Sequence, residues 1–74
     1  GRVWYSALSH ARFRDADLSG AKLIGANLKG ASLDDATLRE ADLSQADVAD
    51  ASFRGADLTG ARLDGTNMAA AYLD

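Results

Sequence analysis

Apolar residues recur at every fifth position of this chain, from near its start to its end. On an α-helix, steps of five residues would turn successive apolar side chains by about 140° around the axis, so no apolar stripe would form. In a straight strand, side chains alternate between two faces, and an odd period would send successive apolar residues to opposite sides. A chain that bends in the same sense once in each repeat would instead point all of them inward. The apolar positions are Val3, Leu8, Phe13, Leu18, Leu23, Leu28, Leu33, Leu38, Leu43, Val48, Phe53, Leu58, Leu63, Met68 and Leu73.

The residues that flank each apolar position supply the means of bending. A small residue, Ala in almost every repeat, stands two positions before the apolar residue, and glycine often stands two positions after it. In a four-residue turn that begins at the apolar residue, this glycine is third, where a type II turn requires a positive φ. Four such corners would close a square coil of about 20 residues, and stacked coils would pair as parallel strands about 4.8 Å apart. The corner glycines are Gly20, Gly25, Gly30, Gly55, Gly60 and Gly65.

The corner position changes in the middle of the chain. Asp35, Glu40 and Gln45 stand where other repeats have glycine, and Asp50 follows them. Because residues other than glycine disfavour positive φ, we expect a different turn at these corners, with neither central residue at positive φ. The sequence therefore predicts one coil that mixes two turn types.

The repeat resembles that of the pentapeptide repeat proteins, whose tandem unit is Ala-(Asp/Asn)-Leu-(Ser/Thr)-Gly. Residues 16–20 and 56–60 match this unit at every position, and residues 26–30 and 41–45 come close to it. The resemblance covers residues 6–74. It implies an all-β fold, the right-handed quadrilateral parallel β-helix, a solenoid with about 20 residues per coil and nearly four coils in this chain.

The same resemblance leaves more than one function open. Some pentapeptide repeat proteins resemble a DNA rod and protect gyrase from quinolones, and others are modules within larger proteins. This chain shows neither the inserted loop nor the capping helix that matter in the gyrase-protecting members. We therefore favour a structural or protein-interaction module over a DNA-mimicking binder and protector of a topoisomerase such as gyrase. A designed scaffold without a biological target is a third interpretation.

Length and composition narrow these interpretations. The 74 residues form a single solenoid domain, 1–74, and we expect it to be a fragment or module of a longer protein. The formal net charge of −3 argues against direct nucleic-acid binding, which requires a basic surface. No apolar run is long enough to span a membrane, and the absence of Cys excludes disulfides and thiolate metal sites.

Catalytic chemistry has little basis in this sequence. His10 is the only histidine, and the adjacent carboxylates Asp34 and Asp35 have no evident pocket. The glycines recur as corners and do not form a phosphate-binding loop before a helix. We therefore expect a protein that is not an enzyme and that has no catalytic residue, cofactor or metal.

Residues 20 apart should stack on the outside of the coil, so the surface divides into columns. Two of these columns alternate in charge from one coil to the next. We expect their side chains to avoid like-charge contacts, to pair between coils and to set the register, with each exposed pair contributing about 0.2–1 kcal/mol. The alternating columns are Arg14, Asp34, Arg54 and Asp74, and Lys22, Asp42 and Arg62.

Short polar side chains often stand directly before the apolar residue. We expect them to bond nearby backbone N–H groups at the turns, which is a structural use of these carboxylates and amides. Phe13 and Phe53 share one face with Leu33 between them, and we expect both rings to belong to the core. The polar residues are Asp17, Asn27, Asp47, Asp57 and Asn67.

Large apolar side chains indicate where a partner could bind. Trp4 and Ile24 fall in one outward column with Tyr5 at the next corner, so they form either an N-terminal cap or a contact patch. The last repeat is also apolar, and no polar segment covers it. Because an uncapped coil exposes core and unpaired backbone groups, we expect protein partners, including a second copy stacked end to end. The candidate contact residues are Trp4, Tyr5, Ile24, Met68, Tyr72 and Leu73.

Overall fold

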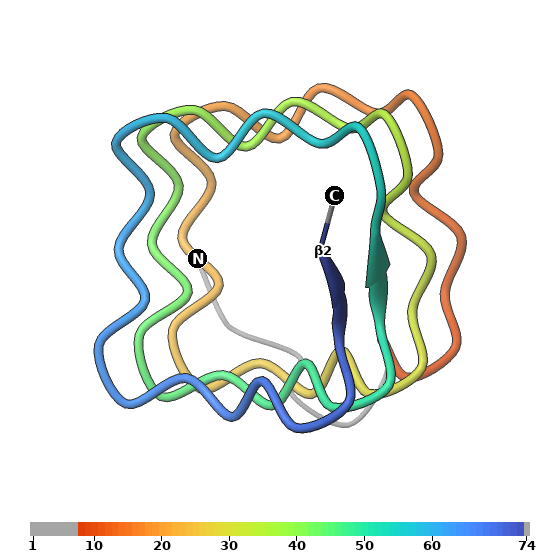
Figure 1. Ribbon diagram of the computed structural model, residues 1–74. Helices are drawn as coiled ribbons and strands as arrows, with labels where there is room; N and C mark the ends of the chain where they lie inside the picture. Colours follow the sequence, from red (N-terminus) through yellow and green to blue (C-terminus); the bar gives the residue numbers. More distant parts are fainter. Residues whose placement is uncertain (1–7, 74) are drawn as a thin grey trace.

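The chain winds into a four-sided coil, seen down its axis in Figure 1. The computed structural model describes residues 8–73. Parallel bridges join Arg12 to Ser32 and Ser32 to Ser52, so each turn of the coil takes 20 residues. Bridges of the same register occur on all four sides, which stacks each turn directly on the preceding one.

Regular strands are short in this fold. Strand β1 (Ser52–Phe53) pairs in parallel with strand β2 (Tyr72–Leu73). The other parallel contacts between described residues are isolated bridges, because a corner interrupts the chain in every repeat. Among residues 8–73 there is no helix long and apolar enough to cross a lipid bilayer.

The hydrogen bonds between turns have a fixed polarity. The N–H of an apolar residue donates to a carbonyl of the next turn, as from Leu28 to Asp47 (2.8 Å). The N–H of the corner residue does the same, as from Gly30 to Ala49 (2.9 Å). In return, the N–H of Asp47 donates to Ala26 of the preceding turn (2.9 Å). Each repeat therefore donates two N–H groups toward the C-terminal end of the coil and one toward the N-terminal end.

Every corner between Leu8 and Ala71 is closed by the same β-turn. The N–H of the small residue donates to the carbonyl of the apolar residue that begins the turn, as from Ala31 to Leu28 (2.9 Å). The third residue of the turn has a positive φ, 57–73°, whether or not it is glycine. The predicted mixture of two turn types is therefore wrong.

The ladder explains why the middle corners do not adopt another turn. The N–H of Gln45 donates to Asp64 in the next turn (2.8 Å), and the N–H of Glu40 donates to Thr59 (2.9 Å). A turn with negative φ would redirect these N–H groups away from their acceptors. The four corners that were expected to differ have positive φ throughout: Asp35 (60°), Glu40 (63°), Gln45 (63°) and Asp50 (62°).

The core is a column of apolar side chains along the axis of the coil. The alanines of the middle corners are buried with it, because the inside of each corner has room only for a small side chain. Phe53 is buried and Phe13 packs against the same cluster, which confirms both rings as core residues. Burial decreases toward both ends of the coil. The fully buried larger side chains are Leu28, Leu33, Leu38, Leu43 and Val48.

Candidate interaction surface

The outer walls carry short polar side chains that bond to their own turns. Asp57 Oδ1 accepts a hydrogen bond from Thr59 N (3.0 Å) and another from Thr59 Oγ1 (2.5 Å). The hydroxyl bond first, and the backbone bond second, lower the pKa of Asp57 below its ordinary value. The equivalent backbone bond confirms the structural use predicted for the whole set: Asp17, Asn27, Asp47, Asp57 and Asn67.

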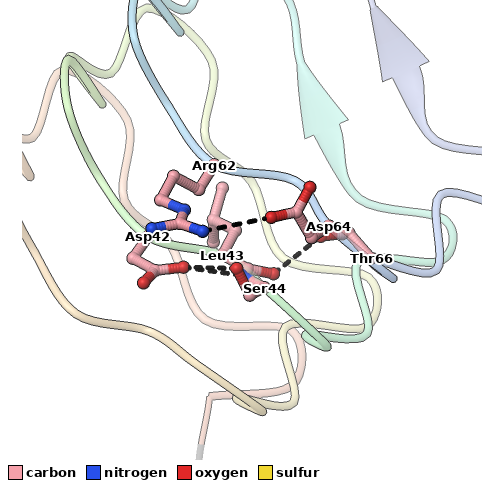
Figure 2. A network of polar contacts seen from close by, with 6 residues as sticks. All are labelled: Asp42, Leu43, Ser44, Arg62, Asp64 and Thr66. Carbon is pink, nitrogen blue, oxygen red and sulfur yellow. Dashed lines mark hydrogen bonds and ion pairs between the residues drawn. The ribbon is translucent and has the colours of Figure 1, made fainter.

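The alternating column of Lys22, Asp42 and Arg62 stacks as predicted, through parallel bridges between successive turns. Its side chains, however, make other contacts. Figure 2 shows Asp42 Oδ1 accepting hydrogen bonds from Ser44 N (3.0 Å) and Ser44 Oγ (2.6 Å), while Arg62 Nη2 approaches Asp64 Oδ2 (3.3 Å). The Ser44 hydroxyl is the main cause of the lowered pKa of Asp42, and the charges of Arg62 and Lys22 add to it. The predicted ion pairs along this column are therefore wrong, although the opposite charges are close enough to interact.

The second column behaves in the same way. Asp34 accepts hydrogen bonds from the Ser52 hydroxyl and from Arg54 N (3.1 Å). The Ser52 bond is the main cause of the lowered pKa of Asp34, with smaller contributions that include the charges of Arg14 and Arg54. The Arg54 guanidinium lies over the Tyr72 ring, 5.4 Å from its centroid, and no ion pair joins it to Asp34. Asp74, the last member of this column, lies outside the described residues.

Side chains at the corners lean toward the next turn of the coil. The Glu40 carboxylate lies where a Cβ on Gly60 would be, with Oε2 only 2.5 Å from that position. The His10 ring lies in the same way over Gly30, at 2.6 Å. Each of these two corner side chains is thus followed by a glycine one turn later, whereas the corners after Asp15 and Asp50 are Asp35 and Ala70. The same arrangement holds for Asp35 with Gly55 and for Gln45 with Gly65.

The last turn of the coil leaves apolar side chains open to solvent. Leu63 is 37% exposed, Tyr72 54% and Leu73 58%, whereas Leu43, which lies under Leu63, is 0% exposed. Met68 is partly buried against the core. The structure therefore brings the predicted residues Met68, Tyr72 and Leu73 into one terminal turn. Sequence reasoning missed Leu63, although it is the last described residue of the apolar column that contains Leu23 and Leu43.

The remaining predicted contact residues do not join this surface. Ile24 is 45% exposed and belongs to the first described turn, in the column that continues with Ser44 and Asp64. Trp4 and Tyr5 lie outside the described residues, so the cap and the patch proposed for them stay predictions. Within residues 8–73, no three His, Asp or Glu side chains converge in a way that could hold a metal ion.

Comparisons with known proteins agree with this architecture. The family model described as pentapeptide repeats matches residues 11–48 and 38–74, with 8 copies. Rfr23, a pentapeptide repeat protein from the cyanobacterium Cyanothece 51142, has a solved structure that is 37% identical in sequence, with a TM-score of 0.58. The match covers 88% of this chain and 41% of Rfr23, so this chain spans less than half the length of that protein.

Two further solved structures are more distant. HetL, a pentapeptide repeat protein involved in heterocyst differentiation regulation from Nostoc sp. strain PCC 7120, is 22% identical, with a TM-score of 0.36 and coverage of 88% of this chain and 56% of HetL. The pentapeptide repeat protein alr5209 from Nostoc PCC 7120 is 26% identical, with a TM-score of 0.30, and the match covers 89% of this chain and 83% of alr5209. No curated protein matches this chain. The family model and the Rfr23 similarity together show that this chain belongs to the pentapeptide repeat family.

Proposed function

We propose that this chain is a non-catalytic protein-interaction module, a right-handed quadrilateral β-helix that binds protein partners through the open ends of its coil. Pentapeptide repeat proteins are generally structural. The partner is a second copy of the chain or a segment of a larger protein that the coil supports.

One observation carries this proposal, the unsatisfied face of the last turn. The N–H groups of Leu43 and Gln45 donate to Arg62 (2.8 Å) and Asp64 (2.8 Å) in the turn above them. Within residues 8–73, the equivalent N–H groups of Leu63 and Gly65 have no backbone acceptor. A partner that stacks on this face would satisfy these groups and bury apolar area, at about 25 cal/mol per Å².

Topoisomerase protection by DNA mimicry has no specific observation in its favour. Such a mimic needs negative charges that are presented outward at regular spacing. The carboxylates of Asp42 and Asp57 instead accept hydrogen bonds from neighbouring residues, and Arg39 pairs with Asp57 at 3.3 Å. We therefore base the proposal on the ends of the coil and not on its walls.

Light scattering across a dilution series tests the proposal with two matched variants. Leu63→Asp places a charge on the open end, and Gln45→Glu places one at an exposed corner of the middle turn. We expect the mass of the wild type and of Gln45→Glu to rise with concentration, and Leu63→Asp to remain monomeric. A wild-type chain that is monomeric at every concentration and binds no dye for exposed apolar surface would contradict the proposal. Loss of association only in Gln45→Glu would place the contact on the wall.

A further inference from the structure

We propose that the last turn of the coil, residues 54–73, docks onto the first described turn, residues 8–27, of a second copy. The copies then join head to tail and not through two C-terminal ends. This inference rests on the proposed function, because it names the partner and the orientation for the same open end. It follows from the polarity of the hydrogen-bond ladder.

The C-terminal end of the coil presents mainly donors. Each interior repeat sends two N–H groups to the following turn and accepts one bond from it through the carbonyl of its small residue. The carbonyl of Ala41, for example, accepts from Arg62 N (2.8 Å). Within residues 8–73, nothing donates to the carbonyl of Ala61, and the N–H groups of Leu58 and Gly60 have no acceptor. Each repeat of the last turn thus offers two donors and one acceptor.

The N-terminal end presents the opposite set. In interior turns, the carbonyls on either side of the apolar residue accept from the turn below, as Ser32 and Asp34 accept from Phe13 (2.7 Å) and Asp15 (3.0 Å). Within residues 8–73, no N–H donates to the equivalent carbonyls of Asp17 and Ser19. The repeat that contains Asp17 and Ser19 thus offers two acceptors and, through the N–H before its apolar residue, one donor.

Only the head-to-tail orientation matches these two sets. Two C-terminal ends face to face would oppose two donors with two donors in every repeat and leave them buried without partners, at about 1–3 kcal/mol for each group. A C-terminal end on an N-terminal end repeats the ladder already present between turns. The two ends also share one four-sided outline, which each turn of the coil repeats with the same register (Figure 1).

The corners of the last turn add no obstacle to this arrangement. Interior corner side chains such as Glu40 lean onto the following turn, at the place where Gly60 has no Cβ to meet them. The corners of residues 54–73 are Gly55, Gly60, Gly65 and Ala70, which have no long side chain to lean onward. The first turn of a second copy can therefore dock although its corners include His10 and Asp15.

This orientation has a consequence for the size of the assembly. A head-to-tail contact uses two different surfaces of each copy, its C-terminal face and its N-terminal face. However many copies join, the assembly still has one C-terminal face and one N-terminal face unoccupied. Contacts of this kind produce open chains unless the rotation closes a ring. The mean mass should thus increase continuously with concentration and pass beyond that of a dimer.

Paramagnetic broadening in NMR spectra separates the two orientations. The chain has no Cys, so Ala69→Cys and Ser19→Cys each provide one position for a nitroxide label. The labelled copy is mixed with an unlabelled copy enriched in ¹⁵N, and the amide peaks of the enriched copy are measured. A label at position 69 should cause loss of peak intensity in residues 8–27, and a label at position 19 should cause it in residues 54–73. Adding Leu63→Asp to the copy labelled at position 69 should restore the intensity.

The outcomes distinguish this inference from the proposed function. Broadening of residues 54–73 by the label at position 69 would show pairing of C-terminal ends, which overturns the head-to-tail orientation but keeps the end of the coil as the contact surface. Broadening confined to wall positions of the middle turn would overturn both. An absence of broadening, together with a monomeric mass at every concentration, would also overturn both.

Discussion

The left-handed corners allow an energetic test, because Gly20 and Gly60 occupy the same corner of different turns. Their φ values are +72° and +73°. A Cβ added at Gly20 would meet nothing within 4 Å, whereas a Cβ at Gly60 would lie 2.5 Å from Glu40 Oε2. Gly20→Ala therefore measures the backbone conformation alone, and Gly60→Ala measures the same conformation plus the contact with Glu40.

The expected magnitudes follow from these two differences. A left-handed conformation costs a residue with a Cβ about 1–2 kcal/mol. Alanine also reduces the entropy of the unfolded chain, which returns about 0.4–1 kcal/mol. We expect Gly20→Ala to lower the free energy of unfolding by about 1 kcal/mol, or about 4–8 °C in Tm for a domain of this size. Gly60→Ala should lower the free energy of unfolding by about 0.5 kcal/mol more than Gly20→Ala does, because the end of the flexible, exposed Glu40 side chain has to move.

Thermal unfolding followed by circular dichroism measures both variants, and Glu40→Gly completes the comparison. In the Glu40→Gly background, Gly60→Ala should cost the same as Gly20→Ala, since the contact is absent. An unchanged Tm for Gly20→Ala would refute the argument that these corners are strained for residues with a Cβ. Equal losses from Gly60→Ala with and without Glu40→Gly would refute the contact between turns.

Three further predictions concern the core, one corner and the walls. Leu33→Ala, in the fully buried column, should lower the free energy of unfolding by about 2–5 kcal/mol, measured by urea titration. Leu63→Ala, at the open end, should lower it by less than about 1.5 kcal/mol. Similar losses of stability in the two variants would contradict the assigned core. Thr66→Ala removes the hydroxyl bond to Leu43 O (2.7 Å, Figure 2) and should cost about 0.5–1.5 kcal/mol, whereas Thr66→Ser should retain the bond. The pKa of Asp57 is lower in the folded chain than in the unfolded chain, where an Asp carboxyl titrates at about pH 4. Asp57 therefore contributes its full stabilisation above about pH 4, and this contribution is lost as the pH falls through the pKa of the folded state. The Tm should therefore fall in acid and fall less for Asp57→Asn, and equal acid sensitivity of the two proteins would contradict the wall contact.

Most of the fold could be predicted from the sequence, because one local pattern is repeated without interruption. The period of five already requires a bend in each repeat, and Leu28 and Leu38 can point inward together only in a closed coil. The turn at the middle corners could not be predicted from the same pattern. Local preference disfavours positive φ at Glu40 and Gln45, but the N–H groups of both residues are held by the next turn. The cooperative ladder therefore outweighs the local preference.

The candidate surface was predictable in position but not in detail. Columns of residues 20 apart correctly placed Asp42 beside Lys22 and Arg62. The ion pairs failed because the Asp42 carboxylate finds donors within its own turn, at Ser44, without ordering a long side chain. The exposure of Tyr72 and Leu73 agrees with the apolar contact surface that the sequence predicted in the last repeat. The donor and acceptor character of each end required the observed ladder.

The distribution of glycine among the corners has a physical reason beyond φ. Glycine and other residues adopt nearly the same backbone here, so conformation alone does not determine where glycine occurs. Gly60 lies under the leaning side chain of Glu40, whereas Gly20 has no neighbour at its Cβ position. A long corner side chain thus restricts the residue one turn later and leaves the residue one turn earlier unrestricted. Packing at the corners therefore runs in the N-to-C direction, as the ladder does, and a coil with this directionality has two ends that are chemically different.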